Sequence, residues 1–83
     1  MSFVIEKISS FLQDENTVEF LEKEKIKQNK KHCFSFKLFD DDGVEYFKGL
    51  SSKKWDFEPL DEFGLAYGCT EIKYLSENKY MTT

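Results

Sequence analysis

Apolar side chains recur along the chain with two periods, first three to four residues and later two. In residues 3–12 the spacing is three and four, which places apolar side chains on one face of a helix. Ser2 precedes this stripe and is a suitable N-cap. The pattern predicts an amphipathic helix over 3–12, whose apolar face consists of Phe3, Val4, Ile5, Ile8, Phe11 and Leu12.

Three polar residues, 14–16, interrupt the stripe. Asn16 followed by Glu19 resembles a capping box, and an apolar stripe resumes with Val18, Leu21 and the aliphatic stem of Lys25. These features predict a second helix that ends near Gln28. One bent helix over 3–28 is the alternative. We prefer two helices, because polar residues lie where a single helix needs its next core side chain.

From His32 onward the period is two, which is typical of a β-strand. His32, Phe34, Phe36 and Leu38 share one face of this strand. The turn sequence 40–43 ends in Asp-Gly, which supplies positive φ angles, and 44–50 returns as the partner strand. The pattern predicts a β-hairpin.

The connection 51–69 is too long to be without structure in a compact domain. Trp55 and Phe57 alternate with acidic residues, which indicates a short extended piece. Pro59 to Gly64 is typical of one helical turn with proline at its start. Alternation resumes over 70–75, and after a turn Tyr80 to Thr82 can return as an edge strand.

A chain of 83 residues forms a single domain, 1–83, because a mass of 9.9 kDa allows only one core. Its 14 aromatic residues favour a folded chain over a disordered one. The elements together predict an α+β fold, with one or two N-terminal helices packed on an antiparallel sheet of about four strands that form two β-hairpins.

The charges are unevenly distributed along the chain. All 12 basic residues are lysine, against 16 acidic residues, and the net charge is −4. Residues 22–37 contain six lysines and two glutamates, whereas 40–62 contain eight acidic residues and three lysines. One interpretation is that both charged segments are solvated faces that keep a small aromatic-rich domain soluble. The functional alternative is an acidic surface for a basic partner, with Trp55, Phe57, Phe63 and Tyr67 as apolar anchors.

We therefore predict a small acidic protein that binds another protein with a basic surface, in the manner of an inhibitor, a toxin-neutralising partner or an accessory protein of a phage or mobile element. The predicted partner-binding residues are Asp40, Asp41, Asp42, Glu45, Trp55, Asp56, Phe57, Glu58, Asp61 and Glu62. A structural or assembly subunit is an alternative, because an edge strand at 80–82 could pair with a neighbouring chain.

A second alternative is a module that binds single-stranded nucleic acid through the lysine-rich segment 23–37 and its aromatic residues. Three observations count against it. Arginine, the residue best suited to phosphate and guanine contacts, is absent. The isoelectric point is near 5.0. The core also needs the face that carries Phe34 and Phe36. We expect no nucleic-acid partner.

Catalytic and metal-binding motifs are absent from the sequence. The acidic turn does not match a calcium-binding EF-hand loop, because counting from Asp40 places Glu45 where glycine is required and Ser51 where glutamate is required. A nucleophilic pair of Cys69 and His32 is conceivable across the fold, but free cysteine is usually a small buried apolar residue. We predict no enzyme activity, no catalytic residues, no metal and no cofactor.

The N-terminus lacks the features of a signal peptide, and no apolar run is long enough to cross a bilayer. Two cysteines, Cys33 and Cys69, are a thin disulfide framework for a secreted domain. The sequence favours reduced thiols in a cytoplasmic protein with no membrane partner.

Overall fold

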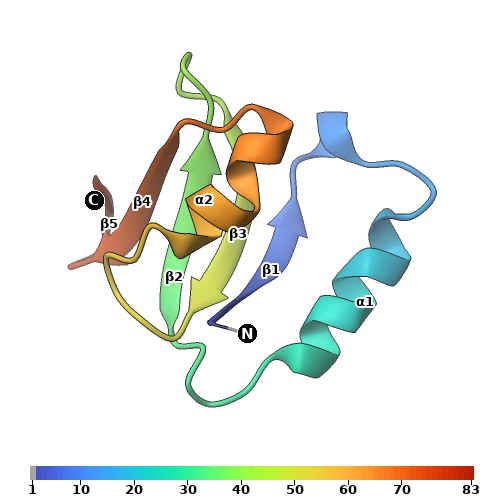
Figure 1. The fold of residues 1–83 in the computed structure, drawn as a ribbon, viewed down its shortest axis with the longest axis horizontal. Coiled ribbons are helices and arrows are strands. Elements are labelled where there is room, and N and C mark those ends of the chain that lie inside the picture. The colour runs from blue at the N-terminus through green and yellow to red at the C-terminus, as the bar shows by residue number, and fades with distance from the viewer. Residues whose placement is uncertain (1) are drawn as a thin grey trace.

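In the described part of the chain, five antiparallel strands form one sheet in the order β1-β3-β2-β4-β5 (Figure 1). The structure is a computed structural model and describes residues 2–83. Its elements, in chain order, are β1 (Phe3–Ile8), the 3-10 helix η1 (Ser10–Leu12), α1 (Thr17–Lys27), β2 (Phe34–Phe39), β3 (Glu45–Ser51), α2 (Glu58–Glu62), the 3-10 helix η2 (Gly64–Tyr67), β4 (Glu71–Ser76) and β5 (Lys79–Thr82). The predicted α+β class is confirmed, with five strands in place of about four.

The strand that the sequence did not predict is β1, which occupies residues 3–8, so the prediction of a helix over 3–12 is wrong. Phe3 and Ile5 face the core as alternating residues of a strand, and a β-bulge between Ile5 and Lys7 shifts the register so that Ile8 faces the core as well. The bulge turns a spacing of two into a spacing of three, which resembles that of a helix. Residues beyond the strand form only the short turn η1.

Helix α1 confirms the second predicted helix, but it does not use the predicted cap or the whole predicted stripe. The Asn16 side chain makes no capping hydrogen bond; instead the hydroxyl of Thr17 accepts one from Asp14 N at 2.8 Å. Val18 is exposed, whereas Phe20 and Leu21 pack against the core. Helix α1 lies beside the β1 edge of the sheet and not over its face, so only a narrow stripe is buried (Figure 1).

The hairpin of β2 and β3 is confirmed. Asp40 Oδ1 accepts hydrogen bonds from the N–H groups of Asp42 and Val44, each at 2.9 Å, and Gly43 adopts the positive φ that closes the loop. On the core face Gly49 lies against Phe36, where a side chain would have no room.

The connection between β3 and β4 crosses the core face of the sheet, and we call residues 52–70 the crossover (Figure 1). The predicted helical turn is confirmed as α2, with Pro59 in its first turn. The predicted extended piece is wrong: Trp55 has a φ of 67° and Phe57 is the helical N-cap residue of α2. The chain must turn sharply there to pass from the end of β3 onto the sheet. Strand β5 confirms the predicted edge strand.

The core lies between the sheet and α2. Leu60 of α2 belongs to the same buried cluster as Phe36, Leu38, Phe47 and Ile72 of the sheet. Phe20 of α1 stacks on Phe63 at 6.0 Å between ring centroids and so joins the two helical segments.

Lysines form a row across four strands on the opposite face of the sheet. In the pairing of neighbouring strands, Lys48 of β3 is the cross-strand partner of both Lys7 and Lys37, and Lys37 of β2 is also the partner of Lys73. Three of them form ion pairs: Lys48 with Glu6 at 3.2 Å, Lys37 with Glu45 at 3.0 Å and Lys73 with Glu71 at 3.5 Å. The carboxylates offset the repulsion within the row, so this face is ionic without being strongly basic.

Candidate functional site

The structure divides the predicted acidic surface into two groups. Asp40, Asp41, Asp42 and Glu45 lie at the β2–β3 turn, while residues 55–58 lie beyond the opposite end of β3, and Asp61 and Glu62 follow on α2 (Figure 1). Strand β3 has seven residues, so its two ends are about 20 Å apart. We call these the hairpin group and the crossover group.

Half of the hairpin group serves the fold. Asp40 holds the turn together through its side chain. Hydrogen bonds from the backbone N–H groups of Val44 and, to a smaller extent, Asp42 lower the pKa of the Asp40 carboxyl. Glu45 pairs with Lys37. Asp41 and Asp42 extend into solvent, and their carboxylates add negative charge at the tip of the hairpin.

The crossover group combines its charges with large exposed apolar side chains. Four such side chains occur within 13 residues, each between 41 % and 56 % exposed, namely Trp55, Phe57, Leu65 and Tyr67. The Trp55 ring packs edge-on against Tyr74 at 5.9 Å, and Lys54 Nζ lies 5.1 Å from its centroid.

Phe63 is not one of these exposed side chains, because it is half-buried and packs against Phe47 at 4.8 Å between centroids. Leu65, which the sequence analysis did not identify, is exposed instead. No periodic signal in the sequence marks Leu65, because the helical backbone is interrupted at Phe63 between α2 and η2.

Carboxylates crowd together on α2. Partial removal from water raises the pKa of Glu62, and the negative charges of Glu58, Asp56 and Asp61 raise it further. Glu58 accepts a hydrogen bond from Ser2 Oγ, and Asp56 Oδ1 accepts one from Glu58 N at 3.1 Å. Asp56 Oδ2 is buried without a hydrogen-bond partner. This arrangement concentrates negative charge where a cation would relieve it.

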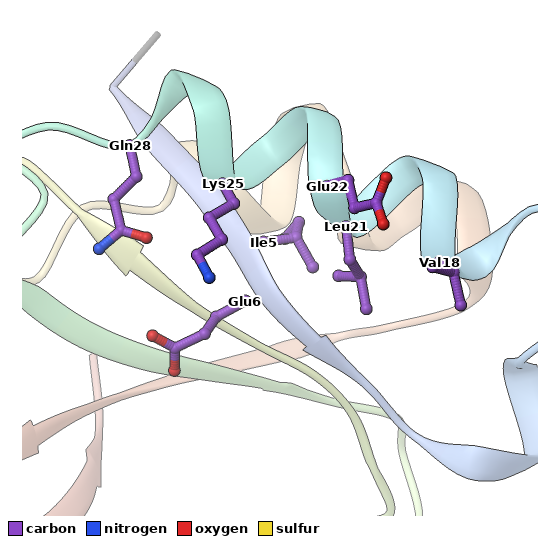
Figure 2. A pocket seen from close by; sticks show the side chains of 7 residues that line it. All are labelled: Ile5, Glu6, Val18, Leu21, Glu22, Lys25 and Gln28. Carbon is purple, nitrogen blue, oxygen red and sulfur yellow. The ribbon is translucent and has the colours of Figure 1, made fainter.

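A groove of about 400 Å³ runs between α1 and β1 (Figure 2). Figure 2 shows Val18, Leu21 and Lys25 projecting from α1 toward the strand, with Glu6 opposite them. The groove has an apolar floor, and its rim carries both acidic and basic groups. It therefore selects for neither sign of charge.

The pair of Cys69 and His32 is excluded. His32 precedes β2, where Cys33 N donates to Ser51 O, whereas Cys69 lies at the other end of β2, where Thr70 N donates to Phe39 O. Burial raises the pKa of the Cys69 thiol to about 11, the opposite of what a nucleophile needs. Both cysteines are free. Within residues 2–83, no three side chains of histidine, cysteine or acidic type gather as metal ligands.

The lysine-rich segment 23–37 does not combine charge with accessible rings. Phe36 is fully buried and Phe34 is half-buried, so neither presents a free face on which a base could stack. Lys37 lies in the ion-paired row on the opposite face.

Neither helix in residues 2–83 combines the length and apolar composition needed to cross a bilayer. Comparison of the chain with known protein families, with curated proteins and with solved structures gives no match.

Proposed function

We propose that this protein binds a basic surface of another protein through the crossover. The surface that makes the contact consists of Trp55, Phe57, Asp61, Glu62, Leu65 and Tyr67, and we call it the crossover surface. One observation carries the proposal: four large apolar side chains are exposed within 13 residues that also present carboxylates to solvent.

Apolar and aromatic side chains of this kind are the groups that stabilise protein complexes. Aromatic side chains are enriched at the centres of protein interfaces, and tryptophan and tyrosine are enriched among the residues that hold complexes together. Trp55 and Tyr67 each pack partly against a neighbouring ring, at 5.9 Å from Tyr74 and 5.0 Å from Phe47 respectively. Little conformational entropy is lost when such preorganised side chains are covered.

The charge of the crossover surface determines the kind of partner. Partial removal from water and then the neighbouring carboxylates raise the pKa of Glu62, so its ionised form is unfavourable in the free protein, and lysine or arginine side chains of a partner would stabilise it. The net charge of −4 and the exposed carboxylates of Asp41 and Asp42 extend the same field beyond the contact. Such a field accelerates association with a basic protein.

A small acidic binding domain of this kind fits an inhibitor, a toxin-neutralising partner, or an accessory protein of a phage or mobile element. In each case the protein acts by occupying the basic surface of its partner, and needs no chemistry of its own.

Site-specific photocrosslinking in the native cell tests the proposal. A photoreactive phenylalanine analogue is introduced at Phe57 or Leu65, and at two control positions, Ile26 and Val44, which are exposed apolar residues elsewhere. We expect a discrete adduct with a basic protein from positions 57 and 65 alone. Equal adducts from all four positions, or an adduct with an acidic protein, would overturn the proposal.

A further inference from the structure

A second pocket, of about 170 Å³, lies between the start of α1 and η2. Four aromatic rings line it, from three different parts of the chain: Phe20 of α1, Phe47 of β3, and Phe63 and Tyr67 of the crossover. Asp14, just before α1, also lines it. The pocket adjoins the crossover surface because Tyr67 belongs to both.

The rings hold one another in place. The Phe47 ring packs edge-on against Phe63 at 4.8 Å and against Tyr67 at 5.0 Å between centroids. Phe63 also lies 5.1 Å from Tyr67 and stacks on Phe20 at 6.0 Å. The walls are therefore preformed, and a ligand would not need to order them.

The faces of aromatic rings are negative and attract cations. Asp14 Oδ1 accepts a hydrogen bond from Asn16 N at 2.8 Å, which holds the carboxylate in place beside the pocket. The volume is sufficient, since a cavity of about 150 Å³ accommodates a molecule as large as benzene. Rings, a fixed carboxylate and this volume together suit an alkylammonium group.

We propose that this pocket binds the alkylammonium group of a lysine side chain from the partner. The source of the lysine rests on the proposed function, whereas the cation preference follows from the pocket alone. The start of α1 contributes partial positive charge, which would favour an anion, but the Asp14 carboxylate is held at that same helix start and opposes one.

Choline and its neutral isostere 3,3-dimethylbutan-1-ol provide the first test, because they differ in charge and hardly in shape. NMR titration of the full chain should show choline shifting the resonances of Phe20 and Tyr67. We expect the isostere to bind roughly tenfold more weakly, which is the scale of desolvated cation–π contacts. Equal binding of the two probes would show a merely apolar pocket, and no binding of choline would exclude a cation site; either result overturns the proposal.

Two variants and one control variant test whether choline binds in this pocket. Tyr67→Leu keeps an apolar wall but removes the ring face, and Asp14→Asn removes the charge; each should weaken choline binding about two- to fivefold. Trp55→Leu removes an exposed ring outside the pocket and should leave choline binding unchanged. Thermal denaturation verifies that each variant is folded. Equal weakening in all three variants would contradict the assignment.

A lysine ligand is tested with Nα-acetyl-lysine methylamide, which should displace choline. Failure to displace it would overturn the lysine assignment and indicate a free quaternary amine as the ligand. These titrations need no partner, so the two proposals fail separately. Choline binding without any crosslinked basic partner would overturn the proposed function, and with it the partner as the source of the lysine, but would leave the cation site standing. A crosslinked partner without choline binding would overturn the cation site alone.

Discussion

The carboxylate of Glu24 on α1 accepts a hydrogen bond from the backbone N–H of Ile5 on β1, with 2.9 Å between Oε1 and N. A side chain of the helix thereby supplies the acceptor that a neighbouring strand would supply. Gln13 makes the converse contact, in which its Nε2 donates to Ile8 O at 2.9 Å. Together these contacts satisfy part of the free edge of β1, which would otherwise be open to pairing with other chains.

Glu24→Ala should lower the free energy of unfolding by about 1–3 kcal/mol, because it leaves the Ile5 N–H without its acceptor at a buried position. Glu24→Gln is the matched control. Its amide oxygen can still accept the bond, and it loses only the half-exposed ion pair with Lys27 at 3.2 Å. Denaturant unfolding and exchange of the Ile5 amide measure both effects. An alanine variant as stable as the wild type would show that α1 does not protect this edge.

Two glycines should respond very differently to alanine. A Cβ at Gly49 would lie 2.3 Å from Val4 O and 2.5 Å from Phe36 Cζ, so Gly49→Ala should separate β1 from β3 and destabilise the protein by about 3 kcal/mol or more. Gly43→Ala meets no neighbouring atom within 4 Å and carries only the strain of its positive φ, about 1–2 kcal/mol. Chemical denaturation ranks the two variants. The reverse order would mean that the β1–β3 contact is not as close as the structure has it.

Much of the fold follows from local pattern, and the errors have physical causes. Period-two alternation predicts β2 and β3 because both strands bury one face along their length, and their register shifts only at the hairpin end, between Leu38 and Phe39. The same reasoning fails for β1, where a bulge changes the spacing of core residues from two to three. It also fails at Trp55, whose left-handed backbone is set by the entry of the chain onto the sheet and not by neighbouring residues.

The candidate site could be predicted only in part. Exposure of Trp55 and Phe57 agrees with their place in a charged segment, but the separation of the hairpin and crossover groups depends on strand length and topology, which composition does not encode. The aromatic pocket joins Phe20 to Phe47 and Phe63, and residues so far apart in sequence are brought together only by the completed fold.

Tyr74→Phe should loosen the start of the crossover. The Tyr74 hydroxyl donates to the carbonyl of Asp56 at 2.7 Å, and the ring supports Trp55. Loss of this hydrogen bond should lower the free energy of unfolding by about 1 kcal/mol. It should also shift the fluorescence emission of Trp55, because water reaches the Asp56 carbonyl. Tyr80→Phe removes a hydroxyl that contacts Ser35 at 2.7 Å, and it should leave Trp55 emission unchanged. Identical spectra for wild type and Tyr74→Phe would contradict this role.

The two thiols should differ in reactivity and in their effect on stability. Cys33 is exposed and Cys69 is buried, so a thiol reagent at pH 8 should modify one thiol in the native protein and two in denaturant. Burial, followed by the charge of Asp40, raises the pKa of Cys69 from 9.0 to about 11.

The Cys69 thiol in the native protein therefore keeps its proton over a pH range in which the same thiol in the unfolded chain has lost it. Stability should fall as pH rises from about 9 toward about 11, and Cys69→Ala should reduce this slope. Rapid modification of both thiols in the native protein would show that Cys69 is accessible.

The central claim is that the crossover surface, and not acidity in general, holds a basic partner. Two variants carry the same change in charge at different places: Asp61→Lys with Glu62→Lys on the crossover surface, and Asp41→Lys with Asp42→Lys at the hairpin tip. All four positions are exposed, so both variants should fold.

The most direct measurement is the binding kinetics of both variants with the purified partner identified by crosslinking, at physiological salt. We predict that the crossover variant loses affinity at least tenfold, chiefly through faster dissociation, while the hairpin variant mainly associates a fewfold more slowly. Equal losses in the two variants would show that the partner responds only to total charge. Unchanged affinity of the crossover variant would contradict the account.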